Sequence, residues 1–231
     1  MKVEILFPEF CNLYGDMYNM KYLKMCIPDA EFIETALDEV PRFVSEDVNL
    51  IYLGPMTENT QEKVIDRLKP YKERIEELIE KNVVFLFTGN SLEVLGKYIE
   101  NEDGSRIEGV GIFDVYSKRD MMHRHNSFLV GKYEDIEIVG FKSQFTMMYG
   151  DNSNLYFIEV EKGIGLNKES KLEGIKKNNY IGTYLIGPIL IQNPLFTKKI
   201  LKEMGCKDIK LALEDDVMAA YEARLKELKK L

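Results

Sequence analysis

The segment that most constrains the fold is residues 83–96, which reads VVFLF, then TGNS, then LEVLG. An unbroken apolar run bounded by turn residues is typical of a central parallel strand covered on both faces. The turn after such a strand is where open α/β sheets place their ligand sites. We therefore expect a buried strand over 83–87, a turn over 88–91 and a short helix over 92–98.

The residues before this segment predict alternating strands and helices. Strands are expected over 2–7, 31–37 and 48–53, and a helix over 17–26. A longer helix is expected over 58–81, since apolar residues recur there at three- and four-residue spacing. The order strand, long helix, strand makes a right-handed parallel crossover the default connection.

Two residues refine the prediction for the long helix. Thr60 has the side chain of a helix cap and is expected to begin the helix. Pro70 lies inside the periodic segment, and proline removes one backbone hydrogen bond, so we expect a kink or a split there.

The pattern changes after about residue 100, where glycines separate short apolar segments. Such segments are typical of antiparallel strands joined by turns. The strands are expected over 110–116, 127–133, 136–141, 154–160 and 179–185, with C-terminal helices over 195–204 and 213–230. No repeat or linker interrupts the chain, so we expect a single domain over 1–231.

Charge and composition exclude several classes of protein. The net charge of −8 argues against a nucleic-acid binder, which needs a basic surface to replace counterions. No apolar stretch reaches the roughly 18–20 residues of a membrane span. The first residues read as a strand and not as a signal peptide, and three scattered cysteines suit a reducing environment. We therefore expect a cytoplasmic protein.

The turn after the central strand carries the first candidate site residues. Thr88, Asn90 and Ser91 could bind a substrate through side-chain and backbone donors at the helix start. Gly89 has no side chain with which to attack, but it can adopt the positive φ of a nucleophile elbow. An ordinary strand-to-helix turn capped by Ser91 is the simpler interpretation.

Few other residues have the pattern of a chemical site. His123 and His125 could face one way on a strand and bind a metal, or could lie in an exposed basic turn. No other potential ligands cluster with them, so no metal site is predicted. No GxxxxGK[ST] or GxGxxG segment is present, so we expect no phosphate cradle, and we expect no cofactor.

Four segments carry a resemblance to a known family. They are residues 10–16, reading FCNLYGD and followed by Asn19, residues 93–98, residues 108–114 and residues 182–194, which contain GTYLIGP and NP. The chain resembles the CobB/CobQ-type class I glutamine amidotransferase domains. Among these it is most similar to the GatD-like glutaminase subunit of bacterial lipid II isoglutaminyl synthase.

The resemblance implies a fold and a reaction. The fold would be flavodoxin-like α/β, with a mostly parallel sheet, an antiparallel extension and helices on both faces. In the family a cysteine on the elbow attacks glutamine, a histidine in GTYLHGP is its base, and ammonia passes to a partner ligase. The cysteine position falls on Gly89 and the histidine position on Ile186. Glycine cannot form a thioester and isoleucine cannot carry a proton.

The resemblance also suggests residues that surround the site. The family loop reads NLYGD, so Asn12, Tyr14, Gly15 and Asp16 are expected near the elbow. The glutamine-binding arginine of the family falls in the region of Arg124.

The leading hypothesis is a pseudoenzyme that acts as partner or regulatory subunit of a Mur-ligase-like amidating enzyme in peptidoglycan biosynthesis. Glutamine or another small molecule could still bind at the elbow. Alternatively, an active amidotransferase subunit could use Thr88 or Ser91 as nucleophile, helped by Glu93 or Asp114, or could use Cys11 from the neighbouring loop. A relative from cobalamin biosynthesis is the third hypothesis.

Overall fold

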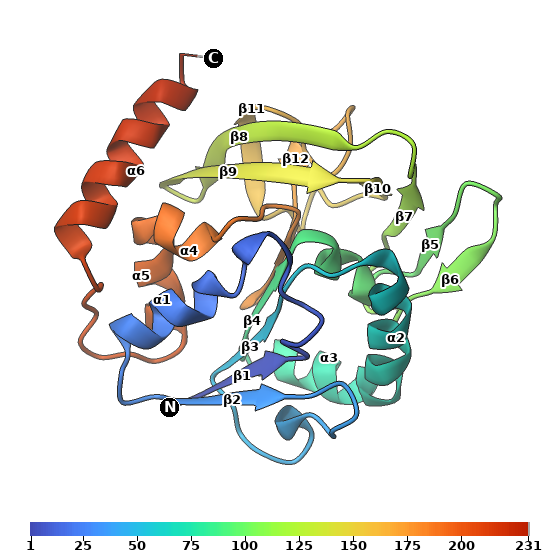
Figure 1. Cartoon of the computed structure of the whole chain (residues 1–231), viewed down its shortest axis with the longest axis horizontal. Coiled ribbons are helices and arrows are strands. Elements are labelled where there is room, and N and C mark those ends of the chain that lie inside the picture. The colour runs from blue at the N-terminus through green and yellow to red at the C-terminus, as the bar shows by residue number, and fades with distance from the viewer. Residues whose placement is uncertain (231) are drawn as a thin grey trace.

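The computed structural model describes residues 1–230 and centres on a six-stranded sheet with helices on both faces (Figure 1). The strand order is β13-β14-β4-β3-β1-β2, and every neighbouring pair is parallel except β13 with β14. This order matches the flavodoxin-like doubly wound arrangement. The strands are β1 Lys2–Leu6, β2 Glu31–Thr35, β3 Leu50–Leu53, β4 Val84–Thr88, β13 Ile175–Lys177 and β14 Tyr180–Thr183. The expected α/β fold with a mostly parallel sheet is confirmed.

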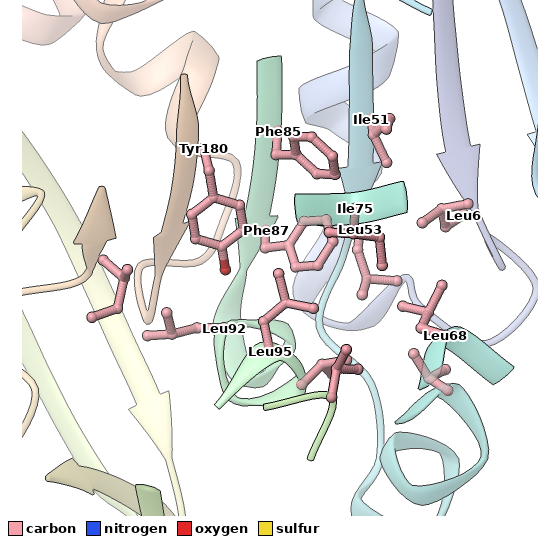
Figure 2. Packing of buried hydrophobic residues seen from close by; sticks show 14 of the residues in the cluster. Leu6, Ile51, Leu53, Leu68, Ile75, Phe85, Phe87, Leu92, Leu95 and Tyr180 are labelled. Carbon is pink, nitrogen blue, oxygen red and sulfur yellow. The ribbon is translucent and has the colours of Figure 1, made fainter. Parts of the chain in front are cut away.

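Strand β4 is buried along its whole length, as its unbroken apolar sequence predicts. Phe85 and Phe87 face one core, which α2 and α3 complete, and Figure 2 shows them packed beside Tyr180 and Leu95. Leu86 faces the opposite core, which α1 and α5 complete. The helices are α1 Tyr18–Cys26, α2 Glu58–Leu68, α3 Lys72–Glu80, α4 Ile189–Gln192, α5 Pro194–Glu203 and α6 Glu214–Leu228. Because both faces are covered, the carboxyl end of β4 is the part of this strand left to form a site.

The long helix predicted over 58–81 is split at the proline, as expected. A 3-10 turn at Lys69–Tyr71 separates α2 from α3. The predicted cap is wrong by one turn, because Thr57 is the N-cap and its hydroxyl oxygen accepts the amide N–H of Thr60 at 3.3 Å.

The helix predicted over 92–98 begins and ends three residues earlier than expected. A 3-10 helix covers Gly89–Leu95, and strand β5 begins at Tyr98. The backbone of Gly96 is extended, and the amide of Gly109 donates to the Lys97 carbonyl at 2.8 Å, which draws the chain into a sheet.

The second half forms two four-stranded sheets with mostly antiparallel pairs, which confirms the expected extension. Their orders are β10-β7-β5-β6 and β12-β11-β8-β9. The strands are β5 Tyr98–Glu100, β6 Arg106–Glu108, β7 Tyr116–Arg119, β8 His125–Tyr133, β9 Ile136–Gln144, β10 Thr146–Tyr149, β11 Ile158–Lys162 and β12 Leu172–Glu173. Across residues 1–230, no helix combines the length and apolar character needed to cross a bilayer.

The strand predicted over 110–116 is wrong for all but its last residue. The amides of Ile112 and Phe113 both donate to the Leu95 carbonyl, and the amide of Gly111 donates to Gly96. The segment therefore wraps around the end of the 3-10 helix, where its backbone groups are satisfied without a neighbouring strand.

Candidate functional site

The turn after β4 has the geometry of an elbow. Gly89 has a φ of +61°, a conformation that side chains rarely adopt. A Cβ placed on Gly89 would lie 2.6 Å from the Pro55 Cβ and 3.1 Å from Ile186 Cγ2. The two positions where the resemblance expects nucleophile and base are therefore neighbours in space, and the nearest atoms that a side chain at position 89 would meet are apolar.

A buried carboxylate lies beneath the elbow and joins four parts of the chain. Asp16 accepts hydrogen bonds from the Tyr52 hydroxyl at 2.9 Å, the Asn19 side-chain amide at 3.1 Å and the backbone of Gly187 at 2.7 Å. The Thr88 hydroxyl also donates to it. Burial raises the pKa of Asp16, whereas these hydrogen bonds act to lower it. We call these five residues the elbow floor, and they hold the 186–187 loop against the end of β4.

The hydroxyl groups of the elbow are used by this packing. The Thr88 and Ser91 side chains are buried, and the Ser91 Oγ lies 2.9 Å from the Leu53 carbonyl and 2.7 Å from the Thr88 carbonyl. Cys11 is buried too, with its Sγ 3.8 Å from the Met56 Sδ, and burial raises the pKa of its thiol. These groups are placed as structural contacts and not as free nucleophiles.

A cavity of about 160 Å³, here called the elbow cavity, lies in front of Gly89. Asn90, Tyr14 and Ile186 contribute to its lining, whereas Thr88 and Ser91 do not. Arg124 also lines it, with its guanidinium stacked 4.4 Å from the centre of the Phe145 ring. Gly89 itself lines this cavity, so the position where the family chemistry requires a thiol lies in its wall and carries no side chain.

Asn90 clamps the elbow to the loop that follows β3. Its side-chain oxygen accepts the Met56 N–H at 3.0 Å, and its side-chain nitrogen donates to the Met56 carbonyl at 2.8 Å. The Met56 N–H is therefore already occupied and is not free to bind an oxyanion.

Glu93 is a buried carboxyl group in the wall of the elbow cavity. Gln61 Nε2 donates to it at 2.8 Å, and the Tyr184 hydroxyl donates at 3.0 Å. Burial raises its pKa to about 7, against the lowering effect of these hydrogen bonds and of the nearby Arg119 charge. Glu93 is among the candidates that the sequence indicates, whereas Gln61 and Tyr184 come from distant parts of the chain and no local pattern points to them.

The remaining candidates from the sequence differ in whether they line the elbow cavity. Tyr14 lines the elbow cavity and has a φ of +59°, and the adjacent Gly15 has a φ of +71°. Asn12 is exposed, donates to the Pro8 carbonyl at 2.7 Å and does not line the cavity. Asp114 is exposed and pairs with Lys97, also outside the cavity lining.

The two histidines do not come together as metal ligands. His123 Nδ1 lies 2.9 Å from Asp120 Oδ1, and His125 Nε2 lies 3.0 Å from the Ser127 hydroxyl. Within residues 1–230, no three His, Cys, Asp or Glu side chains form a group that could hold a metal ion.

Solved structures with this architecture define the fold as that of glutamine amidotransferases. A glutamine amidotransferase from Thermotoga maritima is 15% identical with a TM-score of 0.54, covering 100% of this chain and 94% of that chain. A second glutamine amidotransferase structure is 11% identical with a TM-score of 0.59, covering 87% of this chain and 98% of the other. Residues 2–194 match the CobB/CobQ-like glutamine amidotransferase domain, and the chain therefore belongs to that family.

Two curated relatives are similar over most of their length. Both are the GatD subunit of lipid II isoglutaminyl synthase (glutamine-hydrolyzing). The Staphylococcus aureus (strain N315) protein is 28% identical over 198 residues, which cover 85% of this chain and 80% of the relative. The Streptococcus pneumoniae (strain ATCC BAA-255 / R6) protein is 26% identical over 229 residues, which cover 95% of this chain and 87% of the relative.

Proposed function

We propose that this chain is a glutamine amidotransferase-like subunit that does not hydrolyse glutamine by the Cys–His route. In this proposal it acts as partner or regulatory subunit of a Mur-ligase-like amidating enzyme in cell-wall synthesis. The observation that carries the proposal is that Gly89 and Ile186 occupy the positions where the family chemistry needs a thiol and its base, and that a Cβ added at position 89 would lie only 3.1 Å from Ile186 Cγ2.

Two features of the elbow support the proposed loss of glutamine hydrolysis. Thioester formation needs a nucleophilic side chain on the elbow and a group that accepts its proton, and Gly89 and Ile186 supply neither. The Pro55 ring and Ile186 also occupy the space that a side chain at position 89 would need. The substitutions are therefore accompanied by local packing that suits glycine.

The partner role rests on the relatives. Both curated relatives are named as subunits of a larger enzyme, and this chain spans 80% and 87% of their lengths. A likeness of this extent to proteins of lipid II amidation favours the cell-wall pathway over cobalamin synthesis. The elbow cavity keeps Arg124 and Glu93, so the proposal includes binding of glutamine or another small polar molecule there.

Glutamate release from glutamine tests the catalytic part of the proposal. The purified chain, alone and mixed with a candidate Mur-ligase-like protein from the same organism, should release no more glutamate than a protein-free control. Co-elution of the two proteins in size-exclusion chromatography tests the partner role separately. Sustained turnover by the unmodified chain that is lost in an Arg124→Gln variant would overturn the proposal and exclude a contaminating glutaminase.

A further inference from the structure

A second cavity, of about 290 Å³, lies along strand β10 and is here called the β10 cavity. From residues 145–149, Phe145, Met147 and Tyr149 line it, whereas Thr146 and Met148 do not. Successive side chains of a strand point to opposite faces of its sheet, so this alternation indicates that side chains, and not the backbone, form the floor of the cavity. All three floor residues are partly exposed, so a docked molecule can contact them.

Neighbouring side chains hold both ends of this floor in place. Tyr149 lies directly opposite Tyr116 of β7, and the two rings stack with their centres 5.7 Å apart. At the other end, the Arg124 guanidinium lies 4.4 Å from the centre of the Phe145 ring. Side chains that are fixed before binding lose less conformational entropy when a partner docks, so this floor is suited to recognition.

The rim of the β10 cavity adds more apolar surface. Part of the wall comes from the β7–β8 connection, through Asp120, His123 and Arg124. The same connection carries Met121, which is 39% exposed, and Met122, which is 80% exposed. Aromatic residues, methionine and arginine are enriched in protein–protein interfaces, and methionine suits adaptable binding surfaces. The floor and rim therefore have the composition of a protein-binding surface.

The charge of the wall indicates what kind of protein would fit. Four permanent cations line the cavity against two carboxylates, in a chain whose net charge is −8. A complementary partner surface is therefore acidic. Two copies of a chain with net charge −8 repel each other, which favours a different protein as the occupant. The cations are Lys118, Arg119, Arg124 and Lys168, and the carboxylates are Asp120 and Glu169.

We propose that the β10 cavity and the adjoining Met121–Met122 turn form the docking surface for the Mur-ligase-like partner, an inference that rests on the proposed partner role. The partner presents an acidic segment with a bulky apolar side chain, which lies on Met147 between the two aromatic rings. Its acidic groups face the cationic wall. Because Arg124 and Phe145 line both cavities, the docked segment lies directly beside the elbow cavity.

Biolayer interferometry of the full chain with a candidate Mur-ligase-like protein from the same organism tests this surface. Met147→Asp should weaken binding by at least about tenfold, because it removes an apolar contact and repels an acidic segment. Met122→Asp should weaken binding about fivefold, and its 80% exposure makes a folding defect an unsuitable explanation. Met25→Asp is the matched control and should change the affinity less than about twofold. Met25 is 55% exposed and belongs to α1, which lies away from β7 and β10 in Figure 1.

Ionic strength tests the charge of the partner surface. Lys168→Glu should weaken binding about fivefold at low salt, and the effect should vanish in about 1 M salt, where the Debye length is about 3 Å. Lys226→Glu is the control, because Lys226 is also an exposed lysine but lies on α6. Equal weakening by the two variants would show only a general charge effect and would overturn the proposal.

The remaining outcomes separate this surface from the partner role itself. Binding by the parent chain that survives both Met147→Asp and Met122→Asp would overturn the docking surface and leave the partner role in place. Absence of binding by the parent chain would count against the partner role and this surface together. Light scattering could instead show a dimer of the chain alone that Met147→Asp dissociates. That result would assign the surface to a second copy and would also overturn the proposal.

Discussion

The elbow floor and the region directly above it, here called the mouth, are built from different kinds of contact. In the floor, four donors converge on Asp16, and every part of the carboxylate is satisfied. At the mouth, formed by Gly89, Pro55 and Ile186, only apolar atoms meet. The comparison separates the polar contacts that hold the elbow in place, which are present, from the two positions to which the proposed function assigns the lost chemistry, which carry glycine and isoleucine.

The largest effect should come from the floor. Asp16→Ala removes the acceptor of four hydrogen bonds and leaves several buried donors unpaired, which should lower the free energy of unfolding by about 4 kcal/mol. Urea unfolding of the variant and the parent measures this difference. Asp114→Ala is the control, since this exposed carboxylate should change stability by no more than about 0.5 kcal/mol. Similar losses in both variants would show that Asp16 does not organise the floor.

Glu93 should produce the second largest effect, and it depends on pH. Its pKa in the folded protein is about 7, above the ordinary value of 4.5, because burial disfavours the carboxylate. Its contribution to stability is therefore fully present below about pH 4.5 and is lost as pH rises through 7. The shift of the Glu93 pKa from 4.5 to about 7 corresponds to about 3 kcal/mol in the free energy of unfolding.

Glu93→Gln isolates this contribution. The amide keeps the shape of the side chain and can still accept from Gln61 and meet the Tyr184 hydroxyl. Burial also raises the pKa of Asp16, so both proteins will change with pH, and the difference between them reports on Glu93. Denaturant unfolding between pH 4.5 and 8 should show the variant gaining relative to the parent at high pH. A constant difference across this range would contradict the raised pKa.

Sequence and structure agree best where the pattern is continuous. The apolar run over 83–87 predicted β4, which spans Val84–Thr88, and its burial on both faces, and Pro70 predicted the split helix. The same reasoning was wrong over 110–116, because the backbone there bonds to the end of the 3-10 helix, a contact that residue spacing does not encode.

The site was predicted only in part, for a related reason. The elbow and positions 89 and 186 follow from short motifs. The contacts that complete the site join distant residues, such as Glu93 with Tyr184 or Asp16 with Gly187, and no local pattern records them. The crowding of Gly89 by Pro55 depends on distances of tenths of an ångström, which only the packed chain defines.

The mouth should be sensitive to a single methyl group. Gly89→Ala adds a Cβ that would lie 2.6 Å from Pro55 in a left-handed conformation, and we expect a loss of about 2–3 kcal/mol. Gly104→Ala is a matched control, because its φ is +81° but nothing lies within 4 Å of the added atom, so only about 1 kcal/mol should be lost. Thermal or urea unfolding compares the two. Equal losses would mean that the elbow is not crowded and that glycine serves only the backbone.

Substitutions that rebuild a thiol and a base at the elbow should produce the smallest measurable effect. They also test most directly whether Pro55 and Ile186 block position 89. Gly89→Cys alone should release no glutamate, because Ile186 leaves the thiol without a base. Adding Ile186→His supplies the base, but the Pro55 Cβ still presses on the new side chain, so activity should remain far below that of an active amidotransferase. Adding Pro55→Gly removes this contact and should give the most active of the three variants in a glutamate-release assay. Turnover by Gly89→Cys alone would show that position 186 has no part in the chemistry. A double variant as active as the triple would show that Pro55 does not close the mouth.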